Sequence, residues 1–272
     1  MPVSNQIDTI DRCLSHIKPL LDQLDAELLV IDTGSTDGTV EVCKKYGARV
    51  IAHPWHDNMS AVRNEGIYHA RGEWYMSIDD DEWFEDVEEI LYFFKQGVCR
   101  AYDKASYIQR NYGDSAGTSY EDYHTLRIAR ISPQLHFEGR IHDSLIMEPI
   151  YDKACLLHSY AHHYGFAQDN AEKKREKFVR NTHILLQDVY EYPWNLRYLF
   201  QLANEYRCIE RYDVAVKLFA EAVAVAKEMK DIKPGKSSAV MLIACLYETY
   251  DRRIFPWGKE LLHMFPLATA EA

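Results

Sequence analysis

The sequence predicts a three-layer α/β domain built on a parallel sheet, followed by an all-helical region. Over residues 27–78, short apolar runs typical of buried strands alternate with segments that carry apolar residues at helical spacing. From Asn170 onward, the pattern is almost entirely helical. Together these observations predict an α/β domain over residues 1–168 and a helical domain over residues 169–272.

Local signals place the elements of the α/β domain. Asp8 or Thr9 is a plausible N-cap for the first helix, and Gly47 is expected to close the second. The expected helices are residues 7–24, 40–46, 60–70 and 85–94, and the expected strands of the parallel sheet are residues 27–31, 49–52 and 74–78.

The pattern changes after the fourth helix. Shorter β-type pieces at residues 105–110, 125–128 and 156–160 alternate with polar loops rich in Gly, Ser and Tyr. This alternation suits an antiparallel or mixed extension that completes a substrate pocket.

The helical region carries small and aromatic side chains at a regular spacing over residues 195–230, which resembles one tetratricopeptide-type helical hairpin. A second, poorer hairpin is expected over residues 237–265, with an interruption at Pro256. Because a single hairpin cannot bury its own apolar face, these helices are expected to pack on the α/β domain, on each other or on another chain, including a second copy in a homodimer.

Composition narrows the class of protein. Hydrophobic residues make up 47% of the 272-residue chain, and the formal net charge is -11. This acidity argues against a nucleic-acid-binding surface, which needs an excess of Lys and Arg. The six cysteines are scattered without a Cys-x-x-Cys pair, so we expect reduced thiols in a cytoplasmic protein. Neither an apolar run of about 18 residues nor a secretory signal is found in the sequence, which predicts no membrane span.

Three consecutive aspartates, Asp79–Asp81, follow the third expected strand. Crowded like charges are costly, and Mg²⁺ or Mn²⁺ would relieve that cost by binding carboxylate oxygens while keeping positions open for phosphate oxygens. In an extended segment Asp79 and Asp81 point the same way, so this pair can face one ion while Asp80 faces elsewhere. Asp32 also lies at the carboxyl end of an expected strand, where ligands of parallel sheets bind. The alternative is an acidic strand-to-helix turn.

Four segments carry distinctive polar patterns: Val30–Thr39, Ser60–Gly66, Ile78–Glu82, and Phe137–Asp143 with His163–Phe166 after it. The first three resemble, in this order, the nucleotide-binding turn, the Ala-Arg-Asn helix start and the Asp-x-Asp signature of family 2 glycosyltransferases of the GT-A fold. The fourth resembles the bacterial branch of that family, in which tetratricopeptide-like helices follow the catalytic domain. Each motif is weak alone, and the ordered set covers nearly the whole chain.

The resemblance implies an inverting glycosyltransferase that uses Mn²⁺ or Mg²⁺, a nucleotide-sugar donor expected to be a UDP-sugar, and a peptide, protein or glycan acceptor. His162 and His163 are equally suited to bind a metal by their chemistry alone, and the motif favours His163. The implied donor-binding residues are Asp32, Thr33, Arg63, Asp79 and Asp80, and the implied metal ligands are Asp81, Asp79 and His163.

The resemblance also implies a general base that takes the acceptor's proton as the acceptor attacks the anomeric carbon from the opposite face. Asp143 is the first candidate, and Glu138 and His142 are neighbours that are able to take the same role. A bound cation would neutralise the charge that grows on the leaving nucleoside diphosphate.

Structural roles are alternatives for several of these residues. Asp32 is also suited to cap the following helix, Arg63 to form an ordinary ion pair, and the histidines to be satisfied core groups.

The family's first β-strand has no counterpart here longer than Met1–Val3. This departure favours, as the alternative function, a catalytically weak or inactive remnant that acts as a binding or scaffold module. A nucleotidyltransferase would carry a Gly-rich, basic phosphate loop near its start, and the sequence has none there.

Overall fold

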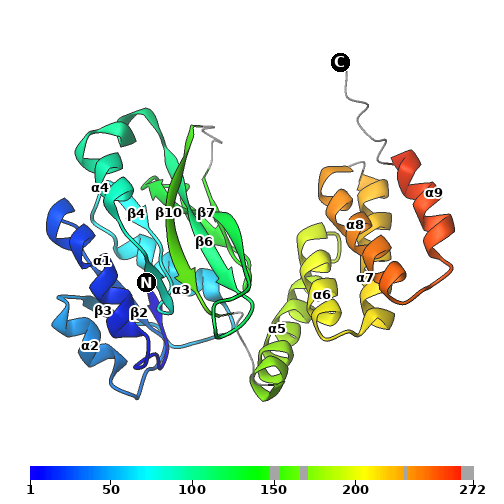
Figure 1. The fold of residues 1–272 in the computed structure, drawn as a ribbon, viewed down its shortest axis with the longest axis horizontal. Coiled ribbons are helices and arrows are strands. Elements are labelled where there is room, and N and C mark those ends of the chain that lie inside the picture. The colour runs from blue at the N-terminus through cyan, green and yellow to red at the C-terminus, as the bar shows by residue number, and fades with distance from the viewer. Residues whose placement is uncertain (148–152, 166–170, 230–231, 265–272) are drawn as a thin grey trace. The chain divides into compact units, whose positions relative to one another are not determined.

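The computed structural model divides into two compact units, Met1–Ala171 and Glu172–Ala272, and each is described by itself (Figure 1). The domain boundary that the sequence predicts, between residues 168 and 169, lies outside the described residues. The described residues are 1–147, 153–165, 171–229 and 232–264.

The first unit begins with a small parallel sheet of strand order β1-β2-β3. Its strands are β1 (Pro2–Val3), β2 (Leu29–Asp32) and β3 (Arg49–Ala52). β1 pairs with β2 at two positions, whereas β2 and β3 pair along all four residues. The strands expected at residues 27–31 and 49–52 are therefore confirmed, and a short first strand is present ahead of them.

The third expected strand belongs to a different sheet. β4 (Trp74–Met76) pairs antiparallel with β7 (Tyr120–Arg130), at one edge of a five-stranded sheet of order β4-β7-β6-β10-β5. The expectation that residues 74–78 continue the parallel sheet is wrong, because β4 pairs with β7 in the other sheet. The other strands of this mixed sheet are β5 (Glu82–Phe84), β6 (Lys104–Tyr112) and β10 (Ala154–His163), which confirm the predicted mixed extension.

The main core of the first unit lies where α1 and α4 pack against the second sheet (Figure 1). Apolar residues of α1 recur at helical spacing and are buried, among them Ile10 and Leu14, and they meet Phe84 of β5 and Tyr107 of β6. The helices of this unit are α1 (Ile10–Leu24), α2 (Thr39–Lys45), α3 (Met59–His69), α4 (Glu88–Lys95) and the 3₁₀ helix η1 (Val98–Ala101), and a hairpin is formed by β8 (His136–Glu138) and β9 (Ser144–Ile146).

The second unit is helical throughout its described residues, which confirms the predicted fold class of an α/β domain followed by helices. Its helices pack on one another through buried side chains such as Ala203, Phe219 and Leu242. Pro256 lies in the first turn of the last helix, where a proline is tolerated, so the break that we expected there falls earlier, at residues 249–253. The helices are α5 (Ala171–Glu191), α6 (Leu196–Cys208), α7 (Tyr212–Met229), α8 (Ile232–Glu248) and α9 (Ile254–Met264).

Within the described ranges, no helix combines the length and the apolar character that crossing a bilayer requires.

Candidate functional site

The turn after β2 is shaped by its own carboxylates. Asp32 Oδ1 accepts a hydrogen bond from Ser35 N at 2.9 Å, across the turn. The amino end of α2 is held by another residue, Asp37, whose Oδ1 accepts from Thr39 N at 3.0 Å. The alternative role of Asp32 as the cap of α2 is therefore wrong, and Asp32 lies partly exposed at the carboxyl end of β2.

The short strand β1 and the loop after it hold this turn in place. Thr33 donates to Val3 O through both its backbone N, at 3.1 Å, and its hydroxyl, at 3.0 Å. Asn5 N donates to Ser35 Oγ at 3.1 Å, and Asn5 Oδ1 accepts from Thr36 N at 2.8 Å. The structure thus places Thr33 in the wall of the turn, with its hydroxyl already bonded to β1.

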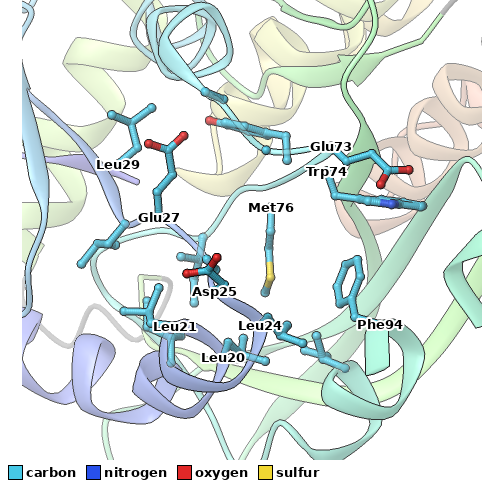
Figure 2. A pocket seen from close by; sticks show the side chains of 18 of the residues that line it. Leu20, Leu21, Leu24, Asp25, Glu27, Leu29, Glu73, Trp74, Met76 and Phe94 are labelled. Atoms are coloured by element: carbon cyan, nitrogen blue, oxygen red, sulfur yellow. The ribbon is translucent and has the colours of Figure 1, made fainter. Parts of the chain in front are cut away.

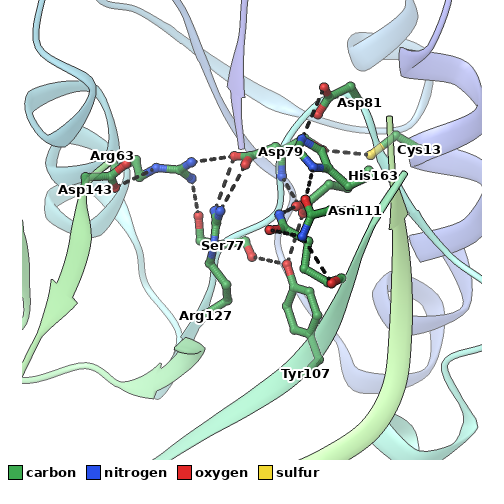
Figure 3. Close-up of polar contacts among 12 residues, drawn as sticks. Cys13, Arg63, Ser77, Asp79, Asp81, Tyr107, Asn111, Arg127, Asp143 and His163 are labelled. Carbon is green, nitrogen blue, oxygen red and sulfur yellow. Dashed lines mark hydrogen bonds and ion pairs between the residues drawn. The ribbon is translucent and has the colours of Figure 1, made fainter. Parts of the chain in front are cut away.

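Asp79 lies between two arginines and not at an open metal position (Figure 3). Its Oδ1 accepts from Arg63 Nη2 at 2.5 Å, and its Oδ2 lies 3.1 Å from Arg127 Nη2. Burial alone would raise the pKa of Asp79, but Arg127 and Arg63 hold that pKa well below its usual range. Asp79 is therefore an ionised anchor just beyond the end of β4.

Arg127 is a site residue that the sequence analysis missed. It lies in β7, between the apolar residues Leu126 and Ile128, and its side chain is 14% exposed. Burial would lower the pKa of its guanidinium, yet Asp79 raises that pKa well above its ordinary value. A charged residue between two apolar neighbours in a strand is the signal for a buried counter-ion, although it does not say which carboxylate supplies it.

Arg63 of α3 joins Asp79 to Asp143. Its side chain is only 4% exposed, its Nη1 donates to Ser77 Oγ at 2.6 Å, and its Nε forms an ion pair with Asp143 Oδ2 at 2.9 Å. Burial lowers the pKa of Arg63, but the Asp79 and Asp143 carboxylates outweigh it and raise the pKa. Arg63 thus has the ion-paired role that the sequence left open. That it also binds the nucleotide-sugar donor stays a prediction.

Asp80 turns toward the beginning of the chain. Its Oδ2 accepts from Ser4 N at 3.1 Å, and its backbone O accepts from the Thr9 hydroxyl at 3.0 Å. Burial, together with the neighbouring carboxylates of Asp81 and Asp79, raises the pKa of Asp80 to about 8. Asp80 therefore connects the loop that precedes α1 to the run of aspartates.

Asp81 lies next to His163 at the end of β10, with 3.6 Å between Asp81 Oδ2 and His163 Nε2 (Figure 3). On the other side of the ring, His163 Nδ1 lies 2.6 Å from Asn111 Oδ1, and Asn111 Nδ2 donates to Gln109 O at 3.3 Å. Because an amide oxygen only accepts, Nδ1 carries the proton, and in the neutral ring the Nε2 lone pair faces Asp81. A lone pair and a carboxylate placed this way call for a cation between them, either a proton or a metal ion.

Gly165 makes room for this pair. A Cβ at this position would lie 2.5 Å from His163 Nε2 and 3.2 Å from Asp81 Oδ2, so a larger residue would have to displace the histidine. Burial raises the pKa of Asp81 to about 6, although His163 opposes that rise. Neither Gly165 nor Asn111 was assigned a role from the sequence. The role of Asn111 depends on how β6 and β10 lie side by side, and that of Gly165 depends on the approach of His163 to Asp81.

The predicted metal ligands come together only in part. Asp81 and His163 are adjacent, whereas Asp79 is taken by its two arginines. In the part of the chain that the structure describes, no three or more His, Cys, Asp or Glu side chains are grouped so that they could hold a metal ion. Mg²⁺ commonly binds through one or two protein ligands, with phosphate and water completing its shell. The observed 3.6 Å lies between about 3 Å, expected for adjacent ligands of an octahedral ion, and about 4.2 Å, expected for opposite ones. The observed spacing matches neither value, so one of the two side chains would have to shift by about 0.6 Å before both could bind such an ion.

His162, the alternative ligand on chemistry alone, has partners at both ring nitrogens. Its Nδ1 lies 2.7 Å from the Tyr112 hydroxyl, and its Nε2 lies 2.8 Å from Glu85 Oε2. Its ring also stacks on Trp83, with centroids 5.3 Å apart. These contacts give His162 a structural role, and the geometry favours His163.

The three candidate bases lie on β8 and in the turn that joins it to β9. Asp143 is 10% exposed and is connected to Asp79 through Arg63. Glu138 and His142 are both exposed, and His142 has a left-handed backbone with a φ of 50°. The structure thus places Asp143, more than its two neighbours, against the aspartate run.

The β8–β9 hairpin is attached to the helix that carries Arg63. Asn64 Oδ1 accepts from Phe137 N at 2.7 Å, and Asn64 Nδ2 donates to Phe137 O at 2.9 Å. The Arg-Asn pair of α3 therefore has two separate tasks: one residue binds the aspartates, and the other binds the backbone of the hairpin.

Comparisons with known proteins agree with this architecture. A TPR repeat-containing protein of Synechococcus elongatus is 29% identical over 182 residues, which are 64% of this chain and 43% of that protein. The SPbeta prophage-derived glycosyltransferase SunS of Bacillus subtilis is 24% identical over 263 residues, which are 90% of this chain and 57% of SunS. The chain thus spans about half the length of these curated relatives.

Solved structures give more distant similarities. The structure of S. aureus TarS 1-349 has a TM-score of 0.49 and 11% identity, and the match covers 90% of this chain and 82% of TarS. Glucosyl-3-phosphoglycerate synthase from Mycobacterium tuberculosis, in complex with Mn²⁺ and UDP-glucose, has a TM-score of 0.34 and 25% identity over 40% of this chain and 42% of that one. The model of the family described as "Glycosyl transferase family 2" matches residues 1–142. Since this match covers more than half of the 272 residues, the chain belongs to glycosyl transferase family 2.

Proposed function

We propose that this chain carries the catalytic site of an inverting glycosyltransferase that moves a sugar from a UDP-sugar to a peptide, protein or glycan acceptor. The observation that supports this proposal most directly is the Asp81–His163 pair at 3.6 Å, with the ring orientation set by Asn111. A cation bound between these two side chains would lie where a family 2 enzyme is expected to bind its donor.

The donor lies along one continuous network of loops. Ser4 N bonds to Asp80, and Asn5 N bonds to Ser35 in the turn after β2, so the loop before α1 joins the two expected donor motifs. Asp32 uses its Oδ1 within the turn. Its Oδ2 is the atom that contacts the ribose or the uracil.

Asp81 and His163 would hold the Mn²⁺ or Mg²⁺ ion. When bound, the ion neutralises the negative charge of the leaving UDP. The chain's own contribution is orientation. Asn111 keeps the proton on His163 Nδ1, and Gly165 leaves the space that the pair needs.

Arg63 and Arg127 are positioning residues. They hold the Asp79 carboxylate immediately after β4, and this fixes the direction in which the next two aspartates leave the strand. Without this anchor, three adjacent carboxylates would repel one another and Asp81 would lose its place beside His163.

Asp143 is the general base. Its carboxylate takes the proton of the acceptor while the acceptor atom bonds to the anomeric carbon and the bond from that carbon to the UDP oxygen breaks. Because attack and departure occur on opposite faces, the configuration at the anomeric carbon inverts. The Arg63 ion pair keeps Asp143 directed toward the aspartate run.

The test is turnover of a panel of nucleotide-sugars with Mn²⁺, scored by release of the free nucleoside diphosphate. We expect Asp81→Asn to abolish turnover without lowering the melting temperature by more than a few degrees. Asp213→Asn, an exposed position in the helical unit, is the matched control and keeps full activity. Turnover that survives in Asp81→Asn would show the metal assignment to be wrong.

The base is tested in the same assay. We expect Asp143→Asn to lower kcat at least about a hundredfold, as is typical for loss of a general base. Glu138→Gln and His142→Gln should lower it much less. A larger loss in either of these two variants would move the base to that residue.

A second candidate is a scaffold that binds without catalysis. It is favoured by the way Arg63 and Arg127 already neutralise Asp79, and by the fact that Asp143 shares Arg63. Calorimetry separates the two candidates, since a scaffold would show no metal-dependent binding of UDP.

A further inference from the structure

Glu82 is a fully buried carboxylate at the start of β5, directly after the run of aspartates. Its Oε2 accepts hydrogen bonds from Asp79 N at 3.2 Å and from the Tyr107 hydroxyl at 3.1 Å. Its Oε1 accepts from Gln109 Nε2. Both oxygens are thus acceptors, and Glu82 binds the first of the three aspartates as well as two residues of β6.

Every second residue of β6 takes part in one chain of hydrogen bonds, because alternate side chains of a strand lie on the same face. Gln109 donates to Glu82, as described above. Asn111 Nδ2 donates to Gln109 O at 3.3 Å and to Gln109 Oε1 at 3.5 Å. At the far end, Asn111 Oδ1 lies 2.6 Å from His163 Nδ1 (Figure 3). Glu82, Gln109, Asn111 and His163 therefore form a continuous chain, which we call the Glu82 relay.

The Glu82 relay has a direction. A carboxylate offers only acceptors, whereas an amide has an oxygen on one side and an NH₂ group on the other. Glu82 therefore requires the NH₂ group of Gln109 to face it, and this turns the Gln109 amide oxygen toward Asn111. The NH₂ group of Asn111 takes that acceptor, so the Asn111 oxygen is left for His163, whose proton must then lie on Nδ1.

The surroundings of Glu82 keep it an acceptor. Burial and then the Glu82 charge raise the pKa of Tyr107 well above its ordinary value, so the Tyr107 hydroxyl keeps its proton and donates. Burial lowers the pKa of Arg127, whereas Asp79 and then Glu82 raise it. The buried charge of Glu82 is therefore offset by a cation nearby.

An apolar cavity of about 850 Å³ lies beside β4, and the Glu82 relay is separate from it (Figure 2). Its lining includes Trp74, Met76 and Phe94. Among the described residues that line it, there is no member of the relay. Water in this cavity therefore does not compete for the hydrogen bonds of the relay.

We propose that Glu82 is a positioning residue, which fixes the tautomer of His163 through the two amides of β6. With the proton held on Nδ1, the Nε2 lone pair faces Asp81, where the proposed function places the cation. Glu82 also binds Asp79 N, so one carboxylate orders both the turn that leads to Asp81 and the ring opposite it. The inference rests on the proposed function, because it concerns the same pair of side chains.

Glu82→Gln tests the direction of the relay. The amide oxygen at position 82 stays at Asp79, because a backbone N–H cannot turn, so the new NH₂ group faces that of Gln109. Gln109 then turns and opposes the NH₂ group of Asn111, which is also held by a backbone oxygen. We expect part of the His163 population to move its proton to Nε2. The ¹⁵N shifts of the ring, recorded at pH 8 without metal or donor, measure this change, and His163→Gln identifies the signal.

A double variant, Glu82→Gln with Gln109→Glu, should restore the direction. The amide at position 82 then donates to a carboxylate at position 109, which again offers only acceptors to Asn111. We expect His163 to return to the Nδ1–H form. In the single variant the affinity for Mn²⁺ in the presence of UDP should fall at least about tenfold, and in the double variant it should recover to within about threefold of the wild type.

Glu89→Gln is the matched control. Glu89 also accepts hydrogen bonds from backbone amides, those of His158 and Ser159 in β10. The same substitution at this position should change neither the ring shifts of His163 nor the affinity for Mn²⁺, even where it lowers the stability of the fold.

The ring shifts decide the outcome. A His163 ring that keeps its Nδ1–H form in Glu82→Gln would overturn the proposal, and so would a mixture of tautomers that persists in the folded double variant. If Glu82→Gln does not fold, Gln109→Met takes its place, since it removes the amide and leaves the other bonds of Glu82. A pure Nδ1–H ring in that variant would equally overturn the proposal. Absence of Mn²⁺ binding in the wild type would refute the proposed function, whereas the ring measurement, made without metal or donor, would still decide the role of Glu82.

Discussion

Arg127 Nη2 lies 3.1 Å from Asp79 Oδ2, and the two side chains are 14% and 23% exposed. The same carboxylate also binds Arg63, which pairs with Asp143 as well, so Asp79 contacts both of these largely buried cations. This arrangement explains why the first of the three aspartates is turned into the protein. The charge of Asp79 stabilises the fold, whereas the third aspartate, Asp81, lies next to His163.

The stability of the α/β unit should depend on Asp79. Asp79→Asn removes the carboxylate that pairs with two largely buried guanidinium groups. Removing one partner of a buried ion pair typically costs about 3 kcal/mol of the free energy of unfolding. Urea denaturation at pH 7 measures the loss. Asp22→Asn is the control, because Asp22 forms an exposed ion pair with Lys18 that is worth at most about 1 kcal/mol. Equal losses in the two variants would contradict the anchoring role.

Gly165→Ala should weaken metal-dependent binding of UDP while the fold persists. The added Cβ would meet His163 Nε2 at 2.5 Å and push the ring away from Asp81. We expect the affinity for Mn²⁺ in the presence of UDP to fall at least about tenfold, measured by calorimetry. Gly258→Ala is the matched control, since a Cβ there meets nothing within 4 Å. Unchanged affinity in Gly165→Ala would place the ion elsewhere.

Asn111→Leu tests the orientation of the histidine. Leu has nearly the same size but offers no oxygen to His163 Nδ1, so the ring loses the partner that fixes its proton. We expect Mn²⁺ affinity to fall by about 10- to 100-fold. The ¹⁵N shifts of the ring should change from a pure Nδ1–H form to a mixture of tautomers. Asn204→Leu, in the helical unit, should affect neither reading. A variant that keeps both the affinity and the ring shifts would refute this role.

Local patterns in the sequence were sufficient for most elements of the fold. The strand at residues 49–52 matches its prediction, and the run from Ile10 to Leu20 shows the spacing of a helix that buries one face. The pairing of β4 with β7 was not predictable in this way, because residues 74–78 have the same apolar pattern whichever strand lies beside them. Which sheet a strand joins depends on its neighbours in space.

The candidate site, too, was predicted only in part. Asp81 and His163 were predicted as partners, and the structure brings them together. The prediction that Asp79 shares the ion rested on the alternation of an extended strand. β4 ends at Met76, and the chain then bends, so the alternation no longer applies. Arg127 was missed because its partner lies 48 positions away, in the segment between β4 and β5.

The buried amino group of Met1 predicts a specific dependence of stability on pH. Its pKa is lowered from 8.0 to about 6, first by burial and then by Arg63, whereas Asp79, Cys13 and Asp80 oppose the shift. Between these two values the unfolded chain binds the proton and the folded chain does not. The free energy of unfolding should therefore rise from pH 6 to pH 8, by at most about 2.7 kcal/mol.

Acetylation of Met1 removes this titration and leaves every other group in place. Asp80 and Asp81 also titrate in this range, but they contribute to both chains. The difference between the two stability curves therefore isolates the amino group. The experiment uses urea denaturation at closely spaced pH values, on protein whose intact Met1 has been verified by mass spectrometry. Parallel curves for the acetylated and free chains would mean that the amino group is hydrated in the folded state, and that the end of β1 is open to water.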